Sequence, residues 1–156
     1  MRILKNKRFA KQAKSLSLTD EAVIRAIDEI RKGSIDARLG GNLIKKRVAI
    51  GEKGKSGGLR TILVYRASAE KLFCIYAFGK NEQENITTQQ LAELKLLAKA
   101  LLELTEESIN KALAAGELIE VVQYDVDEND QKTSNEENGK ASDETSVKRN
   151  RKKNNK

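Results

Sequence analysis

The chain has 156 residues, of which 30 are Lys or Arg and 23 are Asp or Glu, so its formal charge is +7. It contains no His, Pro or Trp and one cysteine, Cys74. These counts exclude a His-based triad, a His metal site, an internal disulfide and a CxxC redox pair. A single thiol and the lack of a long apolar stretch favour a cytoplasmic protein rather than a membrane protein.

The positive charge is concentrated near the N-terminus. Residues 1–60 hold 16 basic and 6 acidic side chains, a net charge of +10, whereas residues 61–122 carry −3 and residues 123–156 carry zero. A one-sided basic surface points toward a polyanion, most often a nucleic acid. The alternative is a solvated basic face that serves solubility.

Two helices are predicted before residue 33. The first covers about residues 6–14, is strongly basic and has only a narrow apolar stripe. The second covers residues 20–32, with Thr19 as its N-cap and Gly33 as its C-terminal stop. Its apolar side chains recur at helical spacing and so fall on one face.

The middle of the chain predicts strands over residues 42–49, 59–66 and 71–78. The first of them carries the basic run Lys45, Lys46 and Arg47, which we expect to contact RNA. The second and third are joined by a connection of hairpin length, so they are expected to pair as a meander.

A glycine-rich segment, residues 51–58, precedes the second of these strands and includes Gly-Lys-Ser. A phosphate-binding P-loop needs four residues between its two glycines and a helix after the Ser, whereas Gly51 and Gly54 have only two residues between them and a strand is expected to follow. The segment therefore reads as a loop in which Lys53 and Lys55 approach a phosphate backbone. The alternative is that both are ordinary loop lysines.

Two more helices, over residues 88–102 and 106–115, begin at the N-caps Thr87 and Thr105, and a short edge strand is expected over 118–122. The remaining segment, 123–156, has almost no apolar residue and is predicted to be disordered. The expected organisation is thus one folded domain, residues 1–122, and a charged tail. The fold class is α+β, with helices packed on one face of an antiparallel sheet of three to four strands.

Basic and aromatic side chains are expected to share one face of this sheet. Period-two spacing aligns Arg60 with Arg66, and Tyr76 with Phe78 and Lys80. Cations hold phosphates and rings stack on unpaired bases, so this combination suits RNA. The alternative is that both rings belong to the core. The same period-two spacing places Cys74 on the face that carries Tyr76. We expect Cys74 to be a small buried residue rather than a nucleophile.

The chain resembles the RelE/HigB superfamily of bacterial toxins over roughly residues 5–122. The resemblance is carried by Gly-Lys-Gly-Lys-Ser-Gly-Gly-Leu-Arg, then Tyr-Ala-Phe-Gly-Lys-Asn-Glu, then Ile-Thr before a Leu-rich helix. The segments 8–11 and 40–45 look like one HigB-type branch. The resemblance implies a RelE-like fold and the toxin of a type II toxin–antitoxin system. Such toxins are ribosome-dependent endoribonucleases that cut mRNA without a metal or cofactor.

The resemblance also implies roles for individual residues. Lys53 and Lys55 match the basic loop that holds phosphate, and one of them helps to deprotonate the 2′-hydroxyl of the RNA. Arg60 matches the strand arginine that stabilises the phosphate, and Lys80 matches a general acid or phosphate clamp. Phe78, or with less support Tyr76, would stack on a base. Arg and Lys suit this chemistry because the transition state gains negative charge.

The partners implied are a cognate antitoxin and mRNA on the ribosome, with no membrane. Two other readings stay open on the same fold. One is a ParE-like toxin that inhibits DNA gyrase without cutting RNA, and the other is a non-catalytic RNA-binding protein. The lysine–glycine loop and Lys80 argue for the nuclease. The tail is not part of the family pattern.

Overall fold

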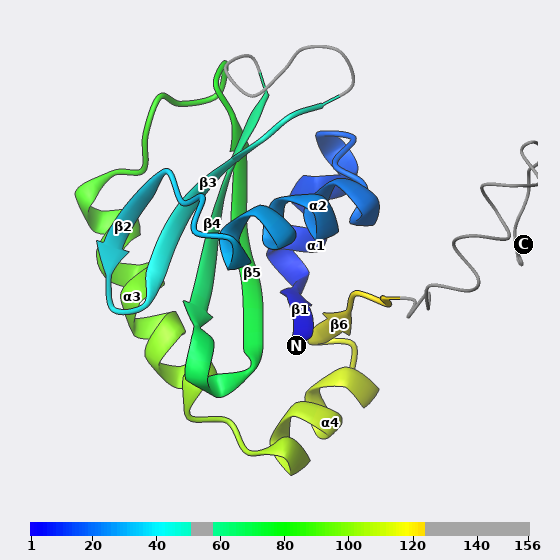
Figure 1. Ribbon diagram of the computed structural model, residues 1–156. Coiled ribbons are helices and arrows are strands. Elements are labelled where there is room, and N and C mark those ends of the chain that lie inside the picture. The colour runs from blue at the N-terminus through cyan, green and yellow to red at the C-terminus, as the bar shows by residue number, and fades with distance from the viewer. Residues whose placement is uncertain (51–57, 124–156) are drawn as a thin grey trace, which may run out of the picture. The chain divides into compact units, whose positions relative to one another are not determined.

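Six strands and four α-helices are found in residues 1–50 and 58–123, the part of the chain that the computed structural model describes (Figure 1). The strands are β1 (Arg2–Asn6), β2 (Ala37–Gly40), β3 (Leu43–Val48), β4 (Leu59–Arg66), β5 (Lys71–Gly79) and β6 (Leu118–Glu120). They form one sheet in the order β2-β3-β4-β5-β1-β6. Neighbouring strands run antiparallel except β1 and β5, which are parallel.

The α+β class is therefore confirmed, but the sheet is larger than the sequence indicates and mixed rather than antiparallel. The two additional strands are β1 and β2, and β1 lies between β5 and β6. The chain divides into two units, Met1–Val122 and Gln123–Lys156. All of these elements belong to the first unit. The predicted disorder of residues 123–156 lies outside the described residues, apart from Gln123.

The helices begin where their capping residues predict. They are α1 (Lys7–Ser15), α2 (Asp20–Arg31), α3 (Thr88–Leu102) and α4 (Glu106–Ala114). Thr19, Thr87 and Thr105 each accept a hydrogen bond from the backbone N–H three positions on, at 3.0 to 3.2 Å. Each bond satisfies an amide that the first turn of a helix leaves without a partner.

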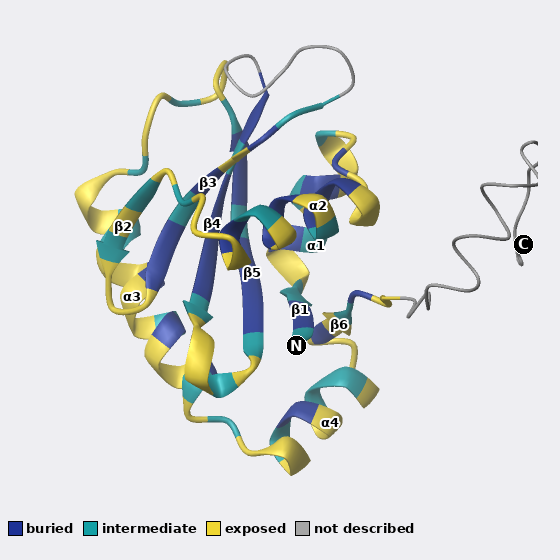
Figure 2. Cartoon of the chain, viewed as in Figure 1, coloured by how far each residue is buried: buried dark blue, intermediate teal, exposed yellow. Residues whose placement is uncertain are grey.

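Helices cover both faces of the sheet, so the prediction that they lie on one face is wrong. One core is built from α1 and α2 with Ile3, Ile44, Leu63 and Leu72, and the other from α3 and α4 with Leu43, Ile62 and Phe73. Successive residues of β4 and β5 are buried, as Figure 2 shows for the middle of the sheet. Strands buried on both sides need cover on both sides.

A β-bulge changes the alternation of side chains along β5. Ile62 pairs with Tyr76 but Leu63 pairs with Cys74, which leaves Ile75 as the extra residue. Ile75 and Tyr76 consequently pack toward the same core, while Cys74 packs toward the other. The predicted common face of Cys74 and Tyr76 is wrong because simple period-two counting does not hold across a bulge.

Candidate functional site

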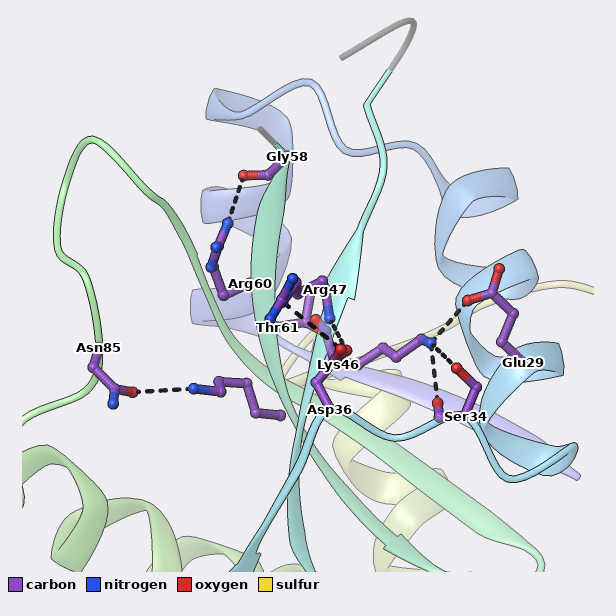
Figure 3. A network of polar contacts seen from close by, with 10 residues as sticks. Glu29, Ser34, Asp36, Lys46, Arg47, Gly58, Arg60, Thr61 and Asn85 are labelled. Atoms are coloured by element: carbon purple, nitrogen blue, oxygen red, sulfur yellow. Dashed lines mark hydrogen bonds and ion pairs between the residues drawn. The ribbon is translucent and has the colours of Figure 1, made fainter. Parts of the chain in front are cut away.

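Two of the cations predicted to act on phosphate, Arg60 and Lys80, lie at one end of the sheet. We call it the Lys80 end, and it is formed where β3 stops, β4 starts and β5 stops. Arg60 lies directly across from Phe78 on the neighbouring strand, and Lys80 follows Phe78 by two residues. Lys80 is exposed and Arg60 is half-buried. The Arg60 guanidinium donates one long hydrogen bond, 3.4 Å, to the Gly58 carbonyl (Figure 3).

A hollow of about 320 Å³ opens at the Lys80 end. It is bounded by the C-terminal turn of α1 (Ser15 and Leu16), by Ile50 and Gly58, and by residues 79–82. Ile50 and Gly58 flank the segment that contains Lys53 and Lys55. Those two lysines lie outside the described residues, so their predicted contribution stays a prediction.

The basic run of β3 is divided between the two faces of the sheet. Lys45 is paired with Ile62 and lies on the α3 face, where its ammonium is 3.5 Å from Asn85 Oδ1. Arg47 is paired with Arg60 on that same face and is exposed, with Asp36 close to its Nε at 3.7 Å. Both lie on the face of the sheet that carries Arg60, and their contact with RNA stays a prediction.

Lys46 points to the opposite face and is buried, with a relative exposure of 1%. Its ammonium lies 2.8 Å from Glu29 Oε1 and donates to the carbonyl and hydroxyl oxygens of Ser34, each at 3.0 Å (Figure 3). The ammonium has three donors, and these contacts engage all of them. The prediction that Lys46 binds RNA is therefore wrong, and the residue ties β3 to α2.

Phe78 and Tyr76 are the two aromatic residues of β5 that were predicted to stack on a base, and the structure places them differently. Phe78 is 1% exposed within the core beneath α3, so it cannot stack on an RNA base, and that prediction is wrong. Tyr76 is half-buried, and its ring centroid lies 5.9 Å from that of Phe78. The Arg8 guanidinium lies over the Tyr76 ring, 5.0 Å from its centroid.

The Tyr76 hydroxyl is fixed by two glutamines. It donates to Gln83 Oε1 at 3.3 Å and accepts from Gln90 Nε2 at 3.1 Å. Gln90 also closes the capping box at the start of α3, where its Oε1 accepts from the Thr87 N–H at 2.8 Å. This network holds the connection between β5 and α3, and Lys80 stands at the beginning of that connection.

Arg66 does not belong to the Lys80 end. Arg60 and Arg66 do share a face of β4, but six residues of extended chain separate them by roughly 20 Å. Arg66 is exposed beside Lys71 at the opposite end of the sheet. Cys74 is fully buried, and burial raises the pKa of its thiol to about 12, so it is inert as the sequence predicts.

A cluster of ion pairs, which we call the Arg2 end, occupies the end of the sheet near Arg66. Arg2 binds Glu120 through two hydrogen bonds of 2.8 and 2.9 Å and reaches Glu106 Oε1 at 2.9 Å. Lys71 reaches Glu106 Oε2 at 2.8 Å. The bonds to Lys71 and Arg2 lower the pKa of Glu106, and those to Arg2 lower the pKa of Glu120. Sequence reasoning missed this cluster because its members come from four separate segments.

Sequence reasoning also assigned no role to one face of α1. Arg8, Lys11, Gln12 and Ser15 have the spacing that places side chains on one helix face. Lys11, Gln12 and Ser15 line a second hollow of about 410 Å³ beside Tyr76. The signal was present as a helical periodicity of polar residues, but only the apolar stripe of this helix was considered.

Neither a cluster of metal-binding side chains nor a membrane-spanning helix is found in the described part of the chain. In residues 1–50 and 58–123, no three His, Cys, Asp or Glu side chains come together as a metal site. None of the helices described there is both long and apolar enough to cross a membrane. Arg and Lys side chains such as those at the Lys80 end are of the type that binds phosphate and stabilises negative charge on it.

Comparison with known proteins gives one family. A family model described as "RelE toxin of RelE / RelB toxin-antitoxin system" matches residues 1–121. No curated protein matches the chain. The match covers the whole of the described sheet and all four helices described with it.

Proposed function

The chain belongs to the RelE toxin family, and on that premise we propose that this toxin is a ribosome-dependent endoribonuclease that cuts mRNA and so inhibits translation. As the toxin of a toxin–antitoxin system it has an antitoxin as its partner. The narrower HigB-type assignment made from residues 8–11 and 40–45 stays a prediction.

The observation that carries this proposal is the state of two cations at the Lys80 end. Within the described residues, neither Arg60 nor Lys80 is ion-paired with a carboxylate. The long bond from Arg60 to Gly58 is also readily exchanged for a phosphate oxygen, because a charge-assisted bond is stronger. Lys80 lines an open hollow of about 320 Å³. Arg60 is not part of its lining but lies at the same end of the sheet, paired with Phe78. The proposal places the scissile phosphate at this end of the sheet, between the two side chains.

The proposed reaction uses the RNA's own nucleophile. The 2′-oxygen attacks the adjacent phosphorus, the bond from phosphorus to the 5′-oxygen breaks, and a 2′,3′-cyclic phosphate and a 5′-hydroxyl result. Arg60 stabilises the negative charge that grows on the phosphate oxygens. Lys80 donates the proton that the departing 5′-oxygen requires, or clamps the phosphate. Lys53 or Lys55 takes the proton from the 2′-hydroxyl.

The ribosome is expected to supply the orientation that this site lacks. Holding reacting atoms in line accounts for a large part of many rate enhancements. The groups at the Lys80 end are few and exposed, so they do little to orient a flexible RNA by themselves. We therefore expect weak cutting of free RNA and strong cutting of mRNA in the decoding site.

The test is controlled expression of the toxin in bacteria with RNA ends mapped across the transcriptome. The proposal predicts growth arrest together with new 5′-hydroxyl ends inside translated codons. Growth arrest with unchanged RNA ends and altered DNA supercoiling would instead establish the ParE-like alternative. Arrest with neither change would point to a non-catalytic RNA-binding protein.

The antitoxin is tested separately through the neighbouring reading frame. Type II toxins are expected to be encoded beside a small antitoxin, often with a DNA-binding domain. Co-expression of that frame should restore growth and yield a complex that co-purifies. Loss of rescue on deletion of the frame would confirm the pairing.

A further inference from the structure

We infer that the hollow beside Tyr76 is a binding subsite for a nucleotide of single-stranded RNA adjacent to the one cut at Lys80. This inference rests on the proposed function, because it extends the path of the RNA away from the Lys80 end. Its walls come from α1 and from the end of β5, which are both described segments.

The first argument is continuity between two hollows. The hollow of about 410 Å³ beside Tyr76 shares Ser15, Leu16 and Glu82 with the hollow of about 320 Å³ that contains Lys80. A strand that places a phosphate at Lys80 can therefore continue along α1 into the second hollow. Single strands are bound in this way, by a groove that follows the backbone.

The second argument is a prepared stacking surface. A base cannot stack on the face of the Tyr76 ring that the Arg8 guanidinium covers. The guanidinium is itself planar, and RNA bases stack on such planes as they do on aromatic rings. Tyr76 lines the hollow, and Arg8, which is not part of the lining itself, lies over the Tyr76 ring, so its guanidinium is the stacking partner that this inference assigns to the base.

The third argument is the distribution of charge around the hollow. Lys11 is exposed on its α1 side, so a phosphate belongs there. Glu82 stands on the opposite side, where its carboxylate accepts from the Gly79 N–H at 3.0 Å and repels phosphate. A carboxylate accepts from amino groups of bases. The RNA backbone therefore lies along α1 and the base edge lies toward Glu82.

Gln12 completes the subsite with a fixed donor. Its Oε1 accepts from the Ala77 N–H at 2.8 Å, which orients the side-chain amide. Its Nε2 donates to no other group within the described residues. A nucleotide in the hollow gives that amide an acceptor, and the pair Gln12 and Glu82 then presents one donor and one acceptor to the base.

Two lysines of the same helix provide a matched test on ribosomes. Lys11 lines the hollow, whereas Lys14, one helical turn further on, is exposed and does not line it. Lys11→Ala should lower cutting of mRNA roughly tenfold, the size expected for one charged hydrogen bond, and Lys14→Ala should leave it close to wild type. Equal effects of the two variants would overturn the subsite, because both remove one charge from one helix.

Two substitutions of Arg8 separate the contribution of stacking from the contribution of charge. Arg8→Ala should lower cutting by about tenfold, within the range measured for loss of one stacked base. Arg8→Lys keeps the charge but removes the plane, so it should resemble Arg8→Ala rather than the wild type. Full activity of Arg8→Lys would show that only charge matters and would overturn the stacking surface. Unchanged melting temperatures establish that all of these variants fold.

A direct binding measurement does not depend on cutting. A trinucleotide with 2′-O-methyl groups cannot be cleaved, and it should shift the backbone amide signals of Leu16, Ala77 and Gln83 at low salt. Lys11→Ala should weaken these shifts and Lys14→Ala should not. Shifts absent from these amides, or unaffected by Lys11→Ala, would overturn the subsite. A loss of antitoxin binding alone in Lys11→Ala would assign the surface to a protein partner instead.

The two proposals fail in different ways. If the wild-type toxin cuts no mRNA, the proposed function fails, while the trinucleotide titration still decides whether the hollow binds RNA. If the wild type cuts mRNA and Lys11→Ala equals Lys14→Ala, the nuclease stands and only the subsite fails.

Discussion

The two ends of strand β5 use the same kinds of side chain for opposite purposes. At the Arg2 end, Arg2 and Lys71 are both held by carboxylates at 2.8 to 2.9 Å. At the Lys80 end, Arg60 touches only a backbone carbonyl at 3.4 Å and Lys80 is exposed. Paired cations fix the structure, and cations without a carboxylate stay available for a phosphate. Residue type alone therefore does not distinguish a structural cation from a functional one.

The difference follows from where acidic residues fall in the fold. Glu120 and Glu106 come from β6 and α4, which join the sheet beside β1 at the Arg2 end. At the Lys80 end Arg47 lies opposite Arg60, so two cations face each other across neighbouring strands, and among the described residues Asp36 lies near Arg47, at 3.7 Å, but no carboxylate is paired with Arg60. Like charges placed opposite each other weaken a sheet. Their persistence at this end is consistent with a polyanionic ligand.

The largest expected effect is on cutting, at the Lys80 end. Arg60→Ala and Lys80→Ala should each lower the rate of mRNA cutting by about 10²–10³-fold, as loss of a single transition-state stabiliser does. The double variant should abolish cutting while the melting temperature stays near that of the wild type. Arg66→Ala is the matched control, since it removes an arginine from the same face of β4 at the other end. An equal loss in Arg66→Ala would remove the distinction between the ends.

The neighbouring residues Lys45 and Lys46 test whether the face of the sheet on which a lysine lies decides between a structural and a functional role. Lys46→Ala should cost about 2 kcal/mol of unfolding free energy, because it removes the buried ammonium that binds the half-exposed Glu29 and leaves space between β3 and α2. Lys45 is half-exposed and has no carboxylate partner among the described residues, so Lys45→Ala should change stability by less than ~0.5 kcal/mol but should lower cutting. Denaturant unfolding and cutting assays measure both. The reverse assignment, with Lys46 governing cutting, would contradict the described orientation of β3.

Arg2→Ala tests directly whether the Arg2 end contributes to stability rather than to cutting. The pair of Arg2 with Glu120 is partly exposed, so solvent screening limits its contribution to about 1 kcal/mol. The melting temperature should fall by about 4 °C, and the rate of cutting per folded molecule should not change. A loss of cutting without a loss of stability would show that the Arg2 end takes part in function.

The smallest expected effect is a pH dependence of the difference in stability between the wild type and Arg2→Ala. Ion pairing lowers the pKa values of Glu106 and Glu120 below their unfolded values. Their contribution to stability is therefore complete above the unfolded pKa and is lost as pH falls through the lowered folded values. The difference in melting temperature between wild type and Arg2→Ala should shrink as pH falls from neutral into that range. A difference that is constant with pH would mean that the carboxylates are not the partners that matter.

Local features of the fold were predictable from the sequence. The helix starts at Thr19, Thr87 and Thr105 depend on side chains only three residues apart, so the sequence shows them directly. The bounds of β4 were predicted as they stand because its apolar run ends at arginines. The placement of Arg60 and Lys80 at the same end of the sheet also followed, since a short connection between β4 and β5 aligns the start of one strand with the end of the other.

Features that depend on distant segments were not predictable. β1 is a strand because it pairs with β5, about 70 positions later, and its own five residues run directly into α1. The bulge at Ile75 reversed the expected face of Cys74, and nothing in the apolar run around it marks the extra residue. Lys46 could not be separated from Lys45 and Arg47 without knowing that α2 supplies Glu29 and Ser34.

The most direct test of the account is the chemistry of the RNA ends in a reconstituted translation system. Purified toxin is added to ribosomes stalled on a defined mRNA, and both ends of the cut are identified. The account predicts a 5′-hydroxyl and a 2′,3′-cyclic phosphate within the codon at the decoding site, formed by the wild type and Arg66→Ala but not by the Arg60→Ala, Lys80→Ala double variant. A 5′-phosphate end, or undiminished cutting by the double variant, would contradict it.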